Sequence, residues 1–309
     1  MSQYSDSTFA EDTNTSWQKT FDLIPKGSLV LDIGCSSGTF GNRLIKEKEC
    51  IVDGIDINDE DLKAAKKVLR NTYRINIEQE PINLKHQYDV VFMGDVIEHL
   101  ATPVETLKKV RKLLKPTGSL VFSIPNILHM SVRLMFLRDE INYGRTGLLD
   151  ETHLHFYNSK EIYRVLNAAG FKIESFDYTV NDIPADILKK ELKEIGLRAE
   201  QKFIELSQTL DAGAYQFIGR ARLGNEKKQI LPSVSPLNII DSYHKKLKED
   251  YNASTARIIA DKDRILLEKQ IVTAEKDQLL AENLRLKRKL SVSAKEFARK
   301  ILNRSSRKD

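Results

Sequence analysis

One short segment, residues 28–41 with the sequence SLVLDIGCSSGTFG, most constrains how this chain can fold. The run from Leu29 to Leu31 is apolar, which suits a strand buried on both faces. The chain then turns through Gly34 and Gly38 into a segment with helical periodicity. Glycine lets a ligand approach the backbone because it has no Cβ, and the start of a helix supplies free N–H groups. The segment therefore predicts the first unit of a nucleotide-binding α/β fold.

The spacing of the glycines separates two kinds of cofactor site. A dinucleotide fingerprint requires G-x-G-x-x-G, and residue 36 is a serine. The pattern present is Asp32-x-Gly34-x-x-x-Gly38, which resembles motif I (D-x-G-x-G-x-G) of class I S-adenosylmethionine (SAM) methyltransferases. Ser36 replaces the middle glycine, and a serine fits there if its φ is negative. A glycine-rich turn without a ligand is the alternative interpretation of this stretch alone.

Alternating strands and helices follow this segment and predict a parallel sheet with helices on both faces. The expected strands cover residues 29–31, 50–57, 73–77, 88–93, 119–124, 171–180 and 214–223. The expected helices cover residues 17–24, 39–49, 60–70, 104–114 and 159–169, and one or two more helices are expected within 182–210. Four motifs lie along this pattern: Gly-Ile-Asp (54–56), Tyr-Asp-Val-Val (88–91), Val-Ile-Glu-His-Leu (96–100) and Lys-Pro-x-Gly (115–118). Together they resemble the ubiquinone-biosynthesis-like group of class I SAM methyltransferases over residues 20–223. The resemblance implies a Rossmann-like, mostly parallel sheet of seven strands, with the last strand antiparallel beside the sixth.

A SAM site is expected at the carboxyl ends of the strands. Asp56 follows the second expected strand, where such folds place the carboxylate that accepts hydrogen bonds from ribose hydroxyls; capping of the next helix is its alternative role. Asn76 stands where related enzymes often have an acidic residue near the adenine. The resemblance implies this set of cofactor-binding residues: Asp32, Gly34, Cys35, Gly38, Asp56, Ile57, Asn76, Gly94 and Asp95.

Residues 127–157 interrupt the alternation at the sheet edge where such folds collect substrate residues. A hydroxyl nucleophile needs a base, and a histidine with a pKa near neutral suits that task. The candidates, in order, are His155, His153 and His129, each with a structural role in the insert as the alternative. If the run to Tyr157 is extended, His153, His155 and Tyr157 share one face.

Two further features of the insert concern the acceptor. Its arginines, at positions 133, 138 and 145, could hold a phosphate or carboxylate. The pattern Gly-Leu-Leu-Asp-x-Thr-His-Leu-x-Phe-Tyr at 147–157 resembles a subgroup found among bacterial surface-polysaccharide genes.

Asp95, Glu98 and His99 would share one face of a helix. With a distant histidine, they could bind a divalent metal ion. In the alternative interpretation Asp95 lies near the cofactor while Glu98 and His99 cap and pack the loop. The second interpretation is favoured, so no residue is assigned as a metal ligand.

The charge of the chain is concentrated at its end. The net charge is +5, but residues 285–309 contain ten basic and two acidic residues, which leaves the rest mildly acidic. The expected parts are a flexible N-terminus (1–20), a methyltransferase domain (21–223), a linker (224–237) and a helical tail (238–309). Apolar residues recur every seven positions from Ile258 to Leu286, so a long helix is expected. A coiled coil that forms homo-oligomers is an alternative for the same residues.

The composition also bears on partners and compartment. A basic amphipathic helix at 285–309 could lie on an anionic membrane or bind a protein partner. No nucleic-acid motif occurs, so no nucleic acid is expected. The chain has no apolar run of transmembrane length and no signal-peptide pattern, and Cys35 and Cys50 are expected to be reduced. A cytoplasmic protein, peripheral at the inner membrane face, is the resulting expectation.

The sequence thus predicts a SAM-dependent O-methyltransferase. From the resemblance, the acceptor is a sugar hydroxyl of a surface polysaccharide or of its lipid-linked precursor. Methylation of a small quinone or phenol is a second interpretation. A non-catalytic scaffold, with a SAM-fold domain joined to an oligomerising helix, is a third.

Overall fold

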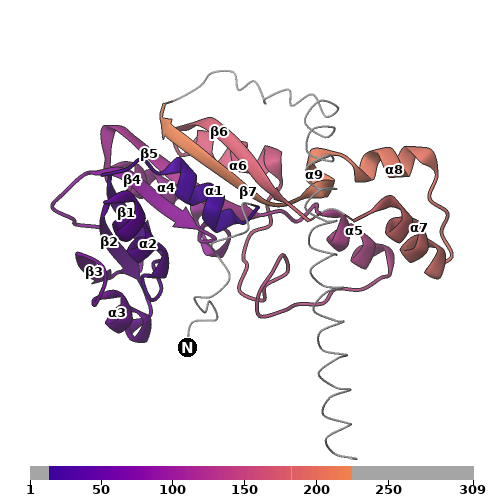
Figure 1. Ribbon diagram of the computed structural model, residues 1–309, viewed down its shortest axis with the longest axis horizontal. Helices are drawn as coiled ribbons and strands as arrows, with labels where there is room; N and C mark the ends of the chain where they lie inside the picture. Colours follow the sequence, from indigo (N-terminus) through magenta and orange to yellow (C-terminus); the bar gives the residue numbers. More distant parts are fainter. Residues whose placement is uncertain (1–13, 182, 225–309) are drawn as a thin grey trace, which may run out of the picture. The chain divides into compact units, whose positions relative to one another are not determined.

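The computed structural model describes residues 14–181 and 183–224 (Figure 1). These residues belong to one compact unit, which spans Met1–Ser233. The expected flexible segment before residue 14 lies outside the described residues. So do the helical tail and all of the linker beyond Gly224, with their coiled-coil, oligomer and membrane predictions.

A seven-stranded sheet in the order β3-β2-β1-β4-β5-β7-β6 forms the centre of the fold. The strands are β1 (Leu29–Ile33), β2 (Ile51–Asp56), β3 (Asn71–Arg74), β4 (Tyr88–Gly94), β5 (Leu114–Pro125), β6 (Phe171–Val180) and β7 (Ala214–Leu223). Strands β1 to β5 run parallel. Strand β7 inserts antiparallel between β5 and β6. The predicted Rossmann-like sheet with an antiparallel last strand is confirmed.

Helices cover both faces of the sheet (Figure 1). They are α1 (Ser16–Leu23), α2 (Thr39–Lys48), α3 (Asp59–Ala65), α4 (Pro103–Arg111), α5 (Met130–Leu137), α6 (Ser159–Ala168), α7 (Ala185–Glu194), α8 (Gln201–Ser207) and α9 (Leu210–Gly213), with a 3₁₀ turn η1 (Ile97–His99). Apolar residues of α1 to α3, such as Phe40, pack with Val30 on one face. Residues of α4 and α6, such as Leu107 and Ile162, pack with Leu31 on the other. Neighbouring residues of β1 thus face two cores, as its continuous apolar run predicts.

A smaller core lies beyond the carboxyl end of β5. Met130 and Leu134 of α5 pack there with Leu188 and Leu192 of α7 and with Ile204 of α8. The predicted insert therefore joins the helices before β7 in a small helical layer (Figure 1).

Element ends follow local capping chemistry. The side chains of Asn58 and Asn158 accept backbone N–H groups at the start of α3 and α6. Thr15 caps α1 in the same way, since its side chain accepts the N–H of Gln18. Strand β3 ends at Arg74, earlier than expected, so Asn76 lies in the following turn.

Candidate functional site

The glycine turn after β1 is built from left-handed residues. Gly34 and Gly38 have φ of 78° and 80°, and a Cβ on Gly34 would lie 2.6 Å from Cγ2 of Val96. Ser36 has a φ of 45°, so the negative φ on which its fit depended is wrong. Polar contacts hold it instead: its N–H donates to Oδ2 of Asp56 at 2.8 Å, and its Oγ lies 3.2 Å from Oδ2 of Asp61. The left-handed backbone of Ser36 is thus strained at the place where a ligand would approach the turn.

The predicted cofactor residues line two adjoining cavities. One, of about 210 Å³, is lined by Asp32, Gly34, Cys35, Gly94 and Asp95 among others. The other, of about 760 Å³, is lined by Gly34, Asp56, Ile57, Asn76, Gly94 and Asp95 among others. Gly38 lines neither cavity. A Cβ there would meet Val68 at 3.0 Å and Ala65 at 3.1 Å, so this glycine allows α2 to pack closely on α3.

Asp56 accepts two backbone hydrogen bonds and lines the larger cavity. Its Oδ2 accepts the N–H of Ser36, and its Oδ1 accepts the N–H of Asn58 at 2.9 Å. The carboxylate therefore joins the glycine turn to the start of α3 while it lines the larger cavity. Each oxygen has a second lone pair that a ribose hydroxyl could use.

Asp32 is the most perturbed group of the smaller cavity. It is 2% exposed, and its Oδ2 has no hydrogen-bond partner. Burial, and then the charge of Asp56, raise its pKa to about 7. A cationic ligand near Oδ2 would favour the ionised form, since an opposite charge lowers a carboxyl pKa.

A third cavity, of about 630 Å³, adjoins the cofactor side through Trp17 and Asp95, which line both it and the 210 Å³ cavity. Its walls come from the start of α1, η1, the ends of β6 and β7, and the loop after α5. The polar uncharged lining residues are Asn14, Thr15, Ser16, Thr146, Thr179, Asn181, Tyr215 and Gln216. Asp95, Glu98, Asp150, His99 and His153 also line it, and no lysine or arginine does among the described residues.

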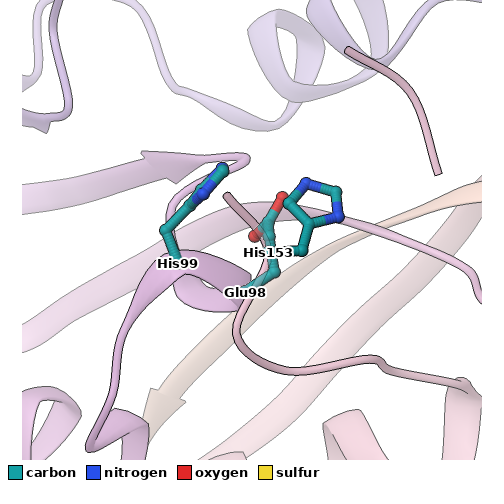
Figure 2. Close-up of side chains that lie close together, drawn as sticks. All are labelled: Glu98, His99 and His153. Carbon is teal, nitrogen blue, oxygen red and sulfur yellow. The ribbon is translucent and has the colours of Figure 1, made fainter. Parts of the chain in front are cut away.

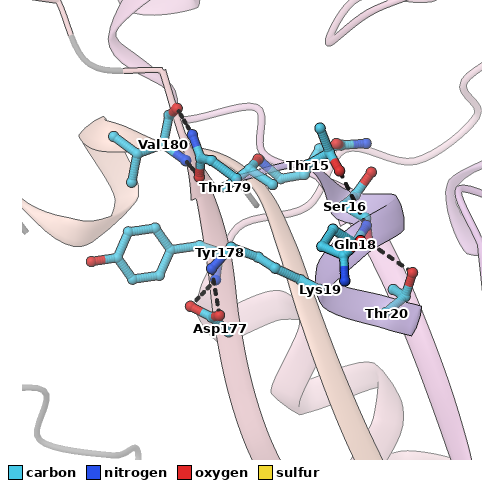
Figure 3. A network of polar contacts seen from close by, with 11 residues as sticks. Thr15, Ser16, Gln18, Lys19, Thr20, Asp177, Tyr178, Thr179 and Val180 are labelled. Atoms are coloured by element: carbon cyan, nitrogen blue, oxygen red, sulfur yellow. Dashed lines mark hydrogen bonds and ion pairs between the residues drawn. The ribbon is translucent and has the colours of Figure 1, made fainter. Parts of the chain in front are cut away.

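Helix α1 is fixed over this cavity by contacts with β6 (Figure 3). The side chain of Asn14 donates to the carbonyl of Val180 at 2.8 Å and accepts the N–H of Val180 at 3.1 Å. Lys19 forms an ion pair with Asp177 at 2.6 Å. These contacts hold Trp17 at the boundary between the 210 Å³ cavity and the 630 Å³ cavity.

The insert arginines do not reach the cavity. Nε of Arg133 donates to the carbonyl of Leu128 at 2.7 Å, and Arg138 pairs with Glu191. Arg145 is exposed and is not a lining residue. The structure therefore does not support the predicted binding of an anionic acceptor group by these side chains.

The three candidate bases lie in different places. His153 lines the 630 Å³ cavity. His155 does not; its Nε2 lies 3.3 Å from the carbonyl oxygen of Ala101. His129 is buried at the start of α5, with Nδ1 2.7 Å from Oγ of Ser131 and Nε2 2.7 Å from the carbonyl of Asn181. His155 and His129 do not line the cavity, whereas His99, which was not a candidate base, does.

Glu98, His99 and His153 form a cluster at the cavity wall (Figure 2). Their ligand atoms lie within 4.8 Å of one another. Glu98 is 0% exposed, and neither carboxylate oxygen has a hydrogen-bond partner. Burial, then the charge of Asp95, raise the pKa of Glu98 well above its usual value. Burial, then His99, lower the pKa of His153, whose Nδ1 has no partner.

This donor set fits a divalent cation. A carboxylate and two imidazoles are common ligands of first-row divalent metals, and a cation would satisfy the unpaired oxygens of Glu98. Asp95, the third residue of the metal set considered in the sequence, binds other side chains. Its Oδ1 accepts from Oγ of Ser123 at 2.8 Å, and its Oδ2 accepts from Nε2 of Gln216 at 3.0 Å. The position of His153 could be known only from the fold.

The strand order, the antiparallel β7 and the cavities beside the glycine turn define a class I SAM-dependent methyltransferase. A model of the methyltransferase-domain family matches residues 9–175, and the chain belongs to that family. Its cofactor is S-adenosylmethionine.

Curated relatives match part of the chain. It is 30% identical over 156 residues to a ubiquinone biosynthesis O-methyltransferase of Nitrosospira multiformis, covering 48% of this chain and 64% of that protein. It is 29% identical over 119 residues to a tRNA U34 carboxymethyltransferase of Desulfotalea psychrophila, covering 36% and 37% respectively. The chain thus spans about a third to two thirds of the length of these relatives.

A solved structure is similar at low identity. The complex of the Haloferax volcanii Trm112 methyltransferase activator and a methyltransferase matches with a TM-score of 0.47 and 15% identity, over 69% of this chain and 90% of that one. Among the described residues, no helix has both the length and the apolar character needed to cross a bilayer.

Proposed function

We propose that this methyltransferase transfers the methyl group of SAM to a hydroxyl of an uncharged, hydroxyl-rich acceptor, and that the acceptor is a sugar of a surface polysaccharide or of its lipid-linked precursor. The observation that carries the proposal is the shared boundary of the cavities. Asp95 and Trp17 line both the 210 Å³ cofactor cavity and the 630 Å³ cavity, which we assign to the acceptor and call the acceptor cavity. A methyl donor on one side and a nucleophile on the other would meet there, as an in-line transfer requires.

The lining of the acceptor cavity supports an uncharged acceptor. Its described side chains offer hydroxyls, amides, carboxylates and two imidazoles, and they include no lysine or arginine to pair with a phosphate. Trp17 and Tyr215 supply apolar ring faces beside these polar groups. Sugars present the same combination of apolar C–H faces and hydroxyls. In a lipid-linked precursor the phosphates would therefore lie outside this cavity.

The hydroxyl oxygen attacks the methyl carbon, the carbon–sulfur bond breaks, and S-adenosylhomocysteine leaves. The hydroxyl must lose its proton to solvent in the same reaction. We propose that Glu98, His99 and His153 hold a divalent cation. Such an ion lowers the pKa of a bound hydroxyl. The unpaired, fully buried carboxylate of Glu98 favours this arrangement over one in which His153 alone acts as the base.

A small phenol or quinol is the second candidate acceptor. The relatives named as ubiquinone biosynthesis O-methyltransferases favour it, since their names describe O-methylation of a small molecule. An uncharged phenol also agrees with the cavity lining.

A location at an anionic membrane surface remains part of the proposal. Its support is the charge of residues 285–309, with ten basic and two acidic residues. Cosedimentation of the full chain with anionic vesicles, but not with neutral ones, is expected. Unchanged cosedimentation after removal of residues 285–309 would contradict this assignment.

The acceptor class can be tested with SAM radiolabelled on its methyl group. Purified protein is incubated with membrane and soluble extracts of the host, and the products are separated into glycan, lipid-linked and small-molecule fractions. Label in glycan or glycolipid supports the sugar acceptor, and label only in small molecules supports the phenol. A protein that binds no SAM would contradict the function and favour a non-catalytic scaffold.

A further inference from the structure

Two residues outside the cluster, Asp150 and Thr152, contact His99 in a way that fixes the position of its proton. Oγ1 of Thr152 donates to Oδ1 of Asp150 at 2.6 Å, and the N–H of Thr152 donates to the same oxygen at 2.8 Å. Nδ1 of His99 lies 3.1 Å from Oγ1 of Thr152 and 3.1 Å from its carbonyl oxygen. The three residues form a chain from carboxylate to hydroxyl to imidazole.

The directions of these hydrogen bonds follow from the number of protons. An ionised carboxylate only accepts, so the single hydroxyl proton of Thr152 points to Asp150. Oγ1 of Thr152 can then only accept from His99, and so can the carbonyl oxygen of Thr152. Both contacts therefore require a proton on Nδ1 of His99. In the neutral ring this leaves Nε2 with the free lone pair.

His153 also has a ring nitrogen available for a ligand. Its Nδ1 is buried and has no hydrogen-bond partner. The rings of His99 and His153 thus each keep one nitrogen for a ligand. Outer partners such as Thr152 set the tautomer of ligating histidines in metal sites.

We propose that Thr152, oriented by Asp150, is a positioning residue of the site, which holds His99 in the tautomer that presents Nε2 to the bound ion and acceptor. The proposal rests on the proposed function, because it assigns a task to a residue outside the ligand set. Thr152 is exposed, contributes no ligand atom to the cluster and lines the 760 Å³ cofactor cavity, so the KM for SAM distinguishes an effect through His99 from a direct effect on the cofactor.

The test compares Thr152→Val, which keeps the shape but loses the hydroxyl, with Thr152→Ser, which keeps the hydroxyl. Asp150→Asn keeps the accepting oxygen and removes the charge. Thr117→Val, an exposed threonine in β5, is the matched control. The readouts are cobalt(II) affinity and visible absorption spectrum, kcat and KM of the full chain, and thermal unfolding to confirm folding.

Thr152→Val is expected to weaken cobalt(II) binding and lower kcat about 10- to 100-fold, with the KM for SAM unchanged. Thr152→Ser is expected to restore both, and Thr117→Val to resemble the wild type. A folded Thr152→Val protein with wild-type cobalt(II) affinity and kcat would overturn the inference, and so would a serine variant no better than valine. A wild-type protein that neither transfers methyl nor binds cobalt(II) would instead overturn the proposed function itself.

Discussion

The backbone carbonyl of Glu98 accepts the N–H of His155 at 3.0 Å. The same oxygen accepts the N–H of Leu154 at 2.9 Å, so the loop is fixed across η1 at this point. His153 thereby lies beside the Glu98 carboxylate, and His155 lies beyond it near Ala101. These two backbone hydrogen bonds separate the two histidines that rank first and second as candidate bases in the sequence.

Replacement of these histidines should therefore have unequal effects. His153→Ala is expected to lower kcat about 10²- to 10⁴-fold, because it removes a group of the reacting cluster. His155→Ala, the matched control, should keep kcat within a few-fold of the wild type. Steady-state kinetics with labelled SAM measures both. Equal losses, or a larger loss in His155→Ala, would contradict this arrangement.

Asp32 should make SAM binding depend on pH. Its pKa is raised to about 7 by burial and by Asp56. SAM is cationic at its sulfonium and ammonium groups, so the ionised carboxylate binds it better, and affinity should rise as the pH rises through about 7. Asp32→Asn should weaken binding about tenfold at high pH and flatten the profile. Calorimetry across this range measures it, and a wild-type profile as flat as that of Asp32→Asn would count against the assignment.

The same group should affect the stability of the ligand-free protein with the opposite sign. The folded state holds the Asp32 proton up to a pH of about 7, whereas the unfolded chain releases it near the ordinary aspartate pKa of 3.8. Between these values the folded state binds more protons, so this group makes stability fall as the pH rises, and the effect is complete above the folded pKa. In urea unfolding, Asp32→Asn should remove this contribution. An unchanged pH dependence would contradict it.

The carboxylate of Glu98 is expected to lower the free energy of unfolding of the metal-free protein. Its buried carboxylate has no hydrogen-bond partner, and removing such a group gains about 1–3 kcal/mol. Glu98→Leu should therefore raise the free energy of unfolding of the metal-free protein while it abolishes methyl transfer. Thr106→Val is the control, because its hydroxyl is also buried and unpartnered but lies in α4. This variant should keep full activity. A destabilised Glu98→Leu protein would show that the carboxylate has a partner in solution.

Removal of the ion should reproduce the loss seen in Glu98→Leu. After dialysis against a chelator, kcat should fall to the level of that variant, and an added divalent cation should restore it. Full activity after chelation would assign His153 as a base that works without metal.

Ser36 should store measurable strain. A left-handed φ costs a non-glycine residue about 1–2 kcal/mol, and the contact with Asp61 offsets part of this. Ser36→Gly is expected to raise the free energy of unfolding by about 1 kcal/mol. Ser37→Gly, at a position whose φ is not positive, should lower it by about 0.5–1 kcal/mol. Denaturant unfolding of both variants checks the signs, and destabilisation by Ser36→Gly would contradict the argument.

The sequence predicted those parts of the site that depend on local patterns. The apolar run at Leu31 and the turn at Gly34 are local, and the sheet with its antiparallel last strand is implied by the family resemblance of the motifs. All predicted cofactor residues except Gly38 line the cofactor cavities. The positive φ of Ser36 was not predicted, because it is imposed by tertiary contacts with Asp56 and Asp61.

The acceptor side was predicted less well, because its residues meet only in the folded chain. His153 reaches Glu98 through backbone bonds between η1 and a distant loop. His129 is buried and caps α5 with its side chain. The periodicity of the sequence does not distinguish such a capping histidine from a catalytic base. Arg133 and Arg138 of the insert bind a backbone carbonyl and a glutamate, and only the structure reveals these partners.

The most direct measurement of the central claim is the chemical identity of the methylated product. The purified full chain, supplied with a divalent cation and isotopically labelled SAM, is incubated with host extract, and the product is analysed by nuclear magnetic resonance. We predict a labelled methyl on an ether oxygen of an uncharged acceptor, which is absent with His153→Ala. A methyl on nitrogen or carbon, or no transfer by a protein that binds SAM, would contradict the account.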